Sequence, residues 1–312
     1  MSNYYVGVDL GGTTVKLGLF SDEGDLLEKW EIPTRKEDNG SHILPDIVES
    51  IEGKMASYDG HIKGIGMGVP GPVTDDGVVR GCVNLGWGNI EAKDELASLT
   101  GVGNVKVGND ANVAALGEIW KGGGRGFDSI VMVTLGTGVG GGIIQHGKIV
   151  NGSTGAAGEI GHIKIKPGAK EVCGCKGHGC LECYTSATGV ANMAKGGVIE
   201  TKNTLEGSYL EGKDITAKDV FDGAKEGDAY CLEIVENFGF LLGVGLANVA
   251  SVADPEAFVI GGGVSKAGNI VIEAVEKNYN DNCMEALKGK QFRLAELGND
   301  AGIYGAVRQV IK

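Results

Sequence analysis

Apolar residues in the first seventy positions fall into short runs separated by glycine and into one longer segment with helical spacing. From 41 to 58 the apolar side chains recur every three or four residues, which predicts a helix with Ser41 as its candidate N-cap. The short runs have the length and composition of β-strands, and the first two flank a Gly-Gly-Thr turn, which predicts a hairpin. The predicted strands are 4–8, 17–20, 25–32, which ends at Pro33, and 62–69.

The rest of the chain continues as predicted strands and helices. The segment 230–252 has the pattern of a core helix, and Gly243 and Gly245 within it permit close packing. Further strands are predicted at 105–108, 130–135, 143–144 and 257–260, and a further helix at 111–120. The predicted strands come first, and a helix then crosses to another strand. This order is expected of a ribonuclease H-like α/β domain.

The stretch from Asp9 to Lys16, Asp-Leu-Gly-Gly-Thr-Thr-Val-Lys, has the composition of a phosphate-binding turn. Gly11 and Gly12 permit positive φ and leave no Cβ between backbone N–H groups and a ligand. Thr13 offers a hydroxyl and Lys16 a positive charge, both suited to phosphate oxygens. The Asp9 carboxylate fits a phosphate site if Mg²⁺ lies between them, because Mg²⁺ binds few carboxylates together with phosphates and water. The motif is neither a Walker loop nor a dinucleotide fingerprint.

A second glycine–threonine turn follows the predicted strand at 130–135. It reads Gly-Thr-Gly-Val-Gly-Gly-Gly over 136–142 and leads into another apolar run, so it repeats the design of the first turn. Thr137 and Gly138 are its candidate phosphate contacts. Two such turns, one in each half of the chain, suit a cleft that closes on a triphosphate from both sides.

Asp110 lies where a predicted strand gives way to a helix. The commonest use of Asp at that position is as an N-cap. The position also suits a general base that accepts the proton of an attacking hydroxyl, the role of an Asp in kinase phosphoryl transfer. Asn109 would hold a substrate hydroxyl or orient Asp110. Gly68, at a strand end, and the amide of Asn84 with the indole of Trp87 are further candidates for ligand contact.

Four of the seven cysteines lie within eleven residues of a chain that shows no signal peptide, which favours a metal site over disulfides. Cys-x-Cys and a third Cys five residues later offer three thiolates on a glycine-rich loop, and a His from a separate segment adds a nitrogen. A closed Cys₃His set is typical of structural zinc. The candidate ligands are His162, Cys173, Cys175 and Cys180, with His178 and Cys183 as rivals.

Composition limits the classes of partner. With 312 residues the chain is expected to form two domains, and its 56 glycines follow no short repeat. A net charge of −13 argues against nucleic acid or an anionic membrane as the main partner. No stretch is expected to approach the roughly 20 apolar residues of a membrane span, so a cytoplasmic protein is predicted.

These blocks, in this order, resemble the ROK family of sugar kinases and sugar-responsive repressors, most closely its bacterial ATP-dependent glucokinases. The Glu-x-Gly-His block at 159–162 and the Cys-x-Cys-x₄-Cys-x-Glu block at 173–182 carry the resemblance, which extends from Asp9 to the Gly-Ala segment at 305–306. It implies two actin-like α/β domains of the sugar kinase/Hsp70/actin superfamily around a nucleotide and sugar cleft. The expected boundaries are 1–115 plus 300–312 for the smaller domain and 116–299 for the larger one, which carries the zinc loop.

The resemblance also implies roles for individual residues. Asp110 would be the base that activates the 6-hydroxyl of the sugar, and His162 would bind zinc with one ring nitrogen and the sugar with the other. The implied sugar contacts are Gly68, Asn84, Asn109, Asp110, Glu159, His162 and Glu182. The implied contacts to ATP and Mg²⁺ are Asp9, Gly11, Gly12, Thr13, Lys16, Thr137 and Gly138, with Gly261, Gly262 and Gly263 as the adenosine motif.

Alternatives remain within the family. Kinases for N-acetylmannosamine, fructose or allose would use hydroxyl contacts of the same kind, and the sequence does not discriminate between these sugars. A non-catalytic sugar sensor is disfavoured because such repressors carry a DNA-binding segment before the kinase-like part, whereas here the first hairpin begins at Tyr4. The kinases of the family imply a homodimer or homotetramer.

Overall fold

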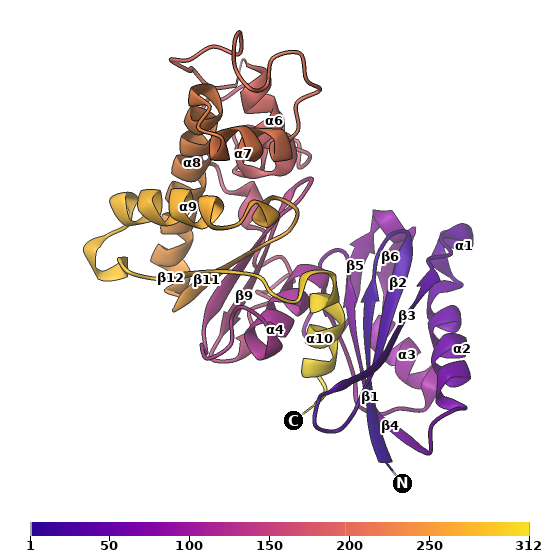
Figure 1. Ribbon diagram of the computed structural model, residues 1–312. Helices are drawn as coiled ribbons and strands as arrows, with labels where there is room; N and C mark the ends of the chain where they lie inside the picture. Colours follow the sequence, from indigo (N-terminus) through magenta and orange to yellow (C-terminus); the bar gives the residue numbers. More distant parts are fainter. Residues whose placement is uncertain (1, 197, 312) are drawn as a thin grey trace. The chain divides into compact units, whose positions relative to one another are not determined.

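The computed structural model describes residues 2–196 and 198–311, which form two compact units (Figure 1). The first unit comprises Met1–Asp128, Gly142–Gly158 and Glu296–Lys312, and the second comprises Ser129–Gly141 and Glu159–Ala295. The expected boundaries differ from these, because they assigned 116–128, 142–158 and 296–299 to the larger domain. Both units are discontinuous in sequence, and each is described by itself.

The first unit is built on a mixed five-stranded sheet of order β3–β2–β1–β4–β7. The outer pairs β2–β1 and β2–β3 are antiparallel, whereas β1–β4 and β4–β7 are parallel. A small antiparallel sheet of two strands lies beyond β4 in the sequence. The strands of this unit are β1 (Ser2–Leu10), β2 (Thr14–Phe20), β3 (Leu26–Pro33), β4 (Gly60–Val69), β5 (Val79–Cys82), β6 (Trp87–Ile90) and β7 (Val105–Asn109).

Successive residues of β1 point to opposite faces of this sheet, and different helices cover the two faces. Val6 and Val8 belong to one buried cluster with apolar residues of α2 and α3. Gly7 points to the opposite face, where an added Cβ would lie 2.2 Å from the Ile303 carbonyl oxygen of α10. Glycine is therefore required where the helix approaches the strand closely. The helices of this unit are α1 (Glu37–Gly40), α2 (Ile43–Met55), α3 (Ala92–Thr100), α4 (Asp110–Lys121) and α10 (Ala301–Arg308).

The C-terminal segment is attached to the first unit by a buried acid. The Glu118 side chain of α4 is fully buried, and its carboxylate accepts hydrogen bonds from the backbone N–H groups of Glu296 and Leu297 at 3.0 and 2.9 Å. A third N–H, from Gly123, donates to the same carboxylate at 2.8 Å. Three donors compensate the burial of the charge, so the segment that leads into α10 is anchored to α4.

The second unit contains β11, which pairs in parallel with both β8 and β12. The sheet that contains β11 has the strand order β10–β9–β8–β11–β12; β9 begins in the second unit and ends in the first, to which β10 belongs. These strands are β8 (Ile130–Leu135), β9 (Val139–Gln145), β10 (Lys148–Ile149), β11 (Ala257–Gly261) and β12 (Gln291–Leu294). The helices are α5 (Glu182–Thr185), α6 (Ala187–Lys195), α7 (Ala217–Lys225), α8 (Ala229–Ala253) and α9 (Asn269–Asn282).

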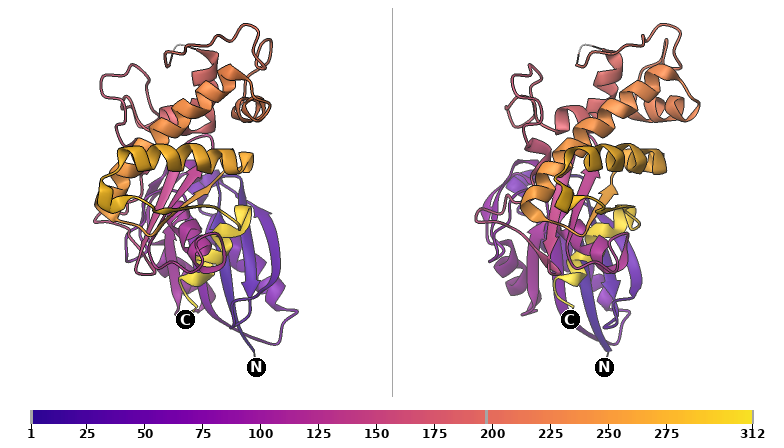
Figure 2. Two further views of the ribbon diagram at one scale, coloured as in Figure 1. Left: turned by 60° about the vertical axis from the view of Figure 1, so that its left-hand side comes forward. Right: turned by 90° about the vertical axis from the view of Figure 1, so that its left-hand side faces the viewer.

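The longest helix, α8, corrects one expectation. It is long and apolar enough to cross a membrane by length and composition alone. Most of its apolar stretch is buried within the structure, as in a core helix. Helix α9 packs across α8 (Figure 2), and an added Cβ on Gly243 would lie 2.7 Å from the Tyr279 backbone nitrogen. The close packing predicted for Gly243 is thus confirmed.

Short 3₁₀ segments complete the secondary structure and bring several site residues into place. They are η1 (Val83–Leu85), η2 (Ile160–His162), η3 (Val264–Ala267), η4 (Glu285–Leu287) and η5 (Gly298–Asp300).

Candidate active site

Strand register in the first unit brings four predicted site residues to one edge of the sheet. Asp9 in β1 pairs with Gly68 in β4, and Val69 pairs with Asn109 at the end of β7. The carboxyl ends of these three parallel strands therefore meet, which is where open α/β sheets place their ligands. Asp110 follows Asn109 directly, and a Cβ on Gly68 would lie 3.6 Å from the Asp110 Cα. Position 68 is therefore in van der Waals range of the backbone of the candidate base.

Asp9 is held in a partly buried position next to a positive charge. Its carboxylate lies 3.8 Å from Lys16 Nζ, and Lys16 also donates to the Asn299 carbonyl oxygen at 3.4 Å. Burial raises the pKa of Asp9, and the charge of Lys16 opposes that rise. A carboxylate that is costly to ionise without a further cation is suited to bind a metal ion.

Asn109, not Asp110, caps helix α4. Its Oδ1 accepts from the backbone N–H groups of Ala111 and Asn112 at 3.0 and 3.1 Å, and its Nδ2 donates to the Gly71 carbonyl at 3.1 Å. The interpretation of Asp110 as the N-cap is therefore wrong, because Asn109 has the extended backbone that an N-cap needs and Asp110 is already the first helical residue. The Asp110 carboxylate accepts from the Ala111 N–H at 2.8 Å.

The first glycine turn has a different conformation from the one expected. Neither Gly11 nor Gly12 has positive φ. An added Cβ on Gly11 would lie 2.9 Å from the Thr14 carbonyl oxygen, which accepts the Gly11 N–H at 3.0 Å. Close approach within the turn, rather than left-handed backbone, thus explains glycine at position 11. A Cβ on Gly12 would lie 3.7 Å from the Asn84 carbonyl oxygen, so Asn84 neighbours this turn.

The indole of Trp87 does not fit the ligand role suggested for it. Trp87 is 5% exposed, belongs to the buried cluster under α2, and donates its Nε1–H to the Gly40 carbonyl at 3.1 Å. It also borders a cavity of about 610 Å³, whose lining includes no other predicted site residue.

In the second unit, the second turn and the glycines after β11 share one edge of the sheet. Gly261 pairs with Thr134, two residues before the turn that contains Thr137 and Gly138. Gly262 has a φ of +84°, and a Cβ there would lie 2.5 Å from the Leu135 carbonyl oxygen, so packing and backbone conformation both require glycine.

Gly263 borders a cavity of about 320 Å³ that suits a flat, mostly apolar group. Phe221 and Val264 contribute apolar surface, and Lys218 and Lys225 contribute charge. Ala187 lines the same cavity and donates its N–H to the Gly136 carbonyl at 2.8 Å. The cavity and the second turn are therefore adjacent. Helix α7, which forms one wall, begins at the Thr216–Asp219 capping box, a start signal legible in the sequence.

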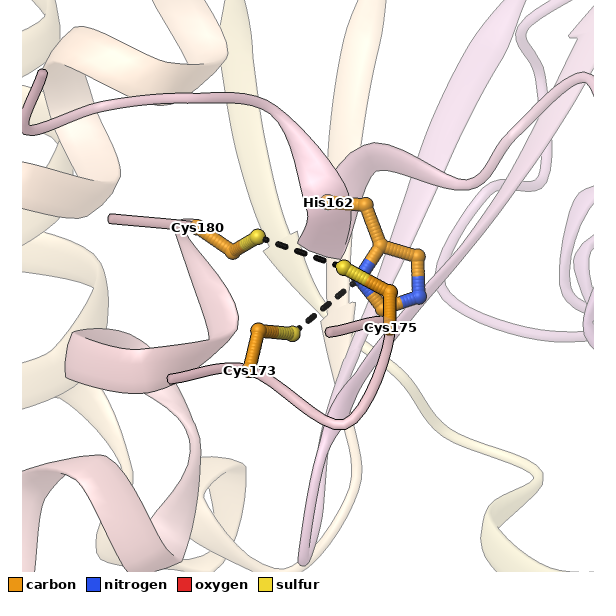
Figure 3. A group of neighbouring side chains, drawn as sticks. All are labelled: His162, Cys173, Cys175 and Cys180. Atoms are coloured by element: carbon orange, nitrogen blue, oxygen red, sulfur yellow. Dashed lines mark hydrogen bonds between the residues drawn. The ribbon is translucent and has the colours of Figure 1, made fainter. Parts of the chain in front are cut away.

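The four candidate metal ligands converge in the structure. The ligand atoms of His162, Cys173, Cys175 and Cys180 all lie within 4.8 Å of one another (Figure 3). His162 Nδ1 is 3.4 Å from Cys173 Sγ, and Cys175 Sγ is 3.6 Å from Cys180 Sγ. A tetrahedral zinc site with Zn–S of about 2.3 Å has edges of roughly 3.7 Å, so the residues fit Zn²⁺. The rival His178 is exposed, with Nδ1 3.3 Å from the Lys170 carbonyl, and neither His178 nor Cys183 belongs to the group.

One charge beside this cluster was not predicted. Lys164 Nζ lies 2.8 Å from Cys180 Sγ, and the hydrogen bond to that sulfur raises the pKa of Lys164. Three thiolates and a neutral His leave a zinc site with one excess negative charge, which an ammonium offsets. Lys164 lies two residues after His162 on the predicted ligand segment, but no motif marked it.

Two predicted sugar contacts lie beside the cluster. His162 turns Nδ1 toward the sulfurs and Nε2 toward Glu159, whose Oε2 is 3.7 Å away. Glu182 places Oε1 3.4 Å from Cys173 Sγ and accepts the Val139 N–H with Oε2 at 2.9 Å. The structure thus brings Glu159, His162 and Glu182 around one candidate metal site.

Comparison with known proteins adds independent findings. The ROK family model matches residues 5–312. A glucokinase of Halalkalibacterium halodurans is 44% identical over 308 residues, covering 97% of this chain and 93% of that protein. An N-acetyl-D-glucosamine kinase of Vibrio cholerae is 31% identical, covering 99% and 100%. The crystal structure of a ROK family glucokinase from Streptomyces griseus in complex with glucose and AMPPNP has a TM-score of 0.75 and 33% identity, covering 98% of this chain and 99% of that one.

Proposed function

The chain belongs to the ROK family, and we propose that it is an ATP-dependent glucokinase that transfers the γ-phosphoryl group of Mg-ATP to the 6-hydroxyl of glucose. The observation that carries the proposal is the edge of the first sheet, where strand register brings Asp9, Gly68 and Asn109 together with Asp110 beside them. A general base and a carboxylate for a metal ion on one strand edge are the parts that phosphoryl transfer to an alcohol needs.

Asp110 acts as the base in this proposal. Its carboxylate accepts the proton of the 6-hydroxyl as the oxygen attacks the γ-phosphorus in line with the departing ADP oxygen. Asn109 fixes the start of α4 through its two capping hydrogen bonds and thereby orients Asp110. Gly68 leaves space for the sugar beside Asp110.

ATP is held by backbone and cations. Gly12, Thr13 and Lys16 of the first turn and Thr137 and Gly138 of the second offer N–H, hydroxyl and ammonium groups to the phosphates. Mg²⁺ supplies charge neutralisation next to Asp9. The adenosine occupies the cavity bordered by Gly263, because that cavity adjoins the second turn through Ala187.

The sugar hydroxyls are held by charged side chains around the zinc cluster. Glu159 and Glu182 accept hydrogen bonds, and His162 donates or accepts with Nε2 while Nδ1 faces the thiolates. Zinc, when bound, fixes the ring orientation of His162. Three thiolates and a His form a closed set, so the metal has a structural role.

A second candidate, an N-acetylglucosamine kinase, is supported by relatives of that name that are 27% to 31% identical. The kinases for N-acetylmannosamine, fructose and allose remain alternatives of the same mechanism. Their sugars share most hydroxyls with glucose, so discrimination rests on groups that would be left unpaired.

ADP release with Mg-ATP against a panel of sugars tests the proposal. The panel contains glucose, N-acetylglucosamine, N-acetylmannosamine, mannose, fructose and allose, with a no-sugar reaction as control. We expect glucose to give the highest kcat/KM. A higher kcat/KM with an N-acetylated sugar would replace glucose as substrate, and turnover with none of them would refute a sugar kinase.

A further inference from the structure

One short segment of the second unit holds the backbone of the second glycine–threonine turn at three points. Glu182 Oε2 accepts the Val139 N–H at 2.9 Å, the Ala187 N–H donates to the Gly136 carbonyl at 2.8 Å, and Thr188 Oγ1 donates to the Thr137 carbonyl at 3.1 Å. The contacts come from seven consecutive residues, 182–188, at the start of α5 and α6. The turn therefore depends on this segment for its shape.

The other end of the segment belongs to the metal cluster. Cys180 is a ligand, and the next residue, Leu181, is fully buried and donates its N–H to the Ile163 carbonyl at 2.9 Å, beside the ligand His162. Tyr184, one turn further on, is also fully buried. Only Leu181 separates the ligand Cys180 from Glu182, so the position of the Glu182 carboxylate follows from the position of the metal site.

Glu182 and the turn also fit each other sterically. A Cβ on Gly138 would lie 2.3 Å from Glu182 Oε2, so the turn lacks a side chain where the carboxylate lies. An ionised acceptor makes a stronger hydrogen bond to Val139 than a neutral one. Nothing in a purely sugar-binding role for Glu182 requires this contact.

We propose that Glu182 is a positioning residue for the nucleotide: it transmits the order of the zinc site to the second glycine–threonine turn, so that zinc supports ATP binding and not only sugar binding. The inference rests on the proposed function, because that function assigns the turn to the ATP phosphates. Without zinc, Cys180 loses its bond to the metal, and the Glu182 carboxylate is held less firmly against the Val139 N–H.

The test measures the affinity of the Mg-complex of a non-hydrolysable ATP analogue by calorimetry, without sugar. The samples are the zinc-loaded protein, the zinc-depleted protein, Glu182→Ala and Glu182→Gln, with Glu206→Ala as matched control. Glu206 is an exposed glutamate of the same unit, outside the metal cluster and the proposed binding residues. Far-UV circular dichroism checks that each sample is folded.

We expect Glu182→Ala and zinc depletion each to weaken nucleotide binding about tenfold, the scale of a lost charge-assisted hydrogen bond or an outer-shell partner. Glu206→Ala should bind the nucleotide as the wild type does. Glu182→Gln, which keeps an oxygen for the Val139 N–H, should restore most of the affinity.

Equal nucleotide affinity in Glu182→Ala, the zinc-depleted protein and the wild type would overturn the inference and leave the proposed function intact. If zinc depletion unfolds the protein, the comparison of Glu182→Ala with Glu206→Ala still decides. No nucleotide binding by the zinc-loaded wild type would refute the proposed function itself.

Discussion

Gly302, near the start of α10, lies against the carboxylate of Asp9: an added Cβ at position 302 would be 2.8 Å from both carboxylate oxygens. The C-terminal helix thus packs directly on the acid that is proposed to face Mg²⁺. Because Glu118 anchors the segment before α10, this contact couples the end of the chain to its first strand. The absence of a side chain at position 302 sets where Asp9 points.

Gly302→Ala should therefore damage nucleotide use. The added methyl group pushes the Asp9 carboxylate away, so we expect the KM for Mg-ATP to rise and kcat to fall about tenfold or more. Gly53→Ala in α2 is the control, because nothing lies within 4 Å of its Cβ. Alanine at 53 should leave kinetics unchanged and stabilise α2 by about 0.5–1 kcal/mol. Unchanged kinetics in Gly302→Ala would exclude the steric coupling.

Asp9→Asn should raise the thermal stability of the protein while it lowers turnover. Burial raises the pKa of Asp9 in the folded protein, so above that pKa the ionised carboxylate opposes folding. At pH 7, without nucleotide, we expect the Asp9→Asn substitution to raise Tm, and the gain should shrink as the pH falls through the raised pKa, where wild-type Asp9 becomes neutral. Turnover should be largely lost at every pH. A lower Tm at pH 7 would show that the Lys16 contact outweighs burial.

Asp110→Asn should slow phosphoryl transfer strongly and have little effect on glucose binding. The amide keeps the shape and the hydrogen bond from the Ala111 N–H but accepts no proton, so kcat should fall by about 10²–10⁴. Glucose affinity, measured by calorimetry, should change less than threefold in our account, about 0.6 kcal/mol. Substantial residual turnover would remove Asp110 as the base.

Cys175→Ser should release zinc and weaken sugar binding. Loss of one of four ligands opens the site and frees His162 from its fixed ring orientation. Cys283→Ser is the control, since Cys283 lies outside the cluster. Metal analysis after dialysis measures the zinc content, which should fall close to zero in Cys175→Ser alone. Full zinc content in that variant would discard the ligand set.

The sequence predicted the site residues that lie on turns and at strand ends. Both glycine–threonine turns, the Cys₃His group and the strand leading to Asn109 are formed by residues close together in the sequence. Such short patterns can be recognised without knowing how the chain folds. The pairing of Asp9 with Gly68 was not predictable in the same way, because it depends on which strands become parallel neighbours.

The N-cap residues of α2 and α4 were also not predictable from the sequence alone. The sequence predicts Ser41 as the cap of α2, but the chain enters that helix from α1, and Ser41 already has helical backbone angles of −61° and −22°. The N-cap position falls on His42, which makes no side-chain capping bond. An N-cap side chain acts from extended backbone, which only Asn109 has at the start of α4. The sequence identifies candidate N-cap residues, but the backbone conformation determines which of them caps the helix.

The most direct test of the central claim is identification of the product. Protein, glucose and Mg-ATP are incubated, and the mixture is analysed by ³¹P and ¹³C nuclear magnetic resonance. We predict one new phosphate monoester, glucose 6-phosphate, formed in equal amount to ADP and at least about a hundredfold more slowly with Asp110→Asn. Inorganic phosphate without a sugar ester, or phosphorylation at another hydroxyl, would contradict the account.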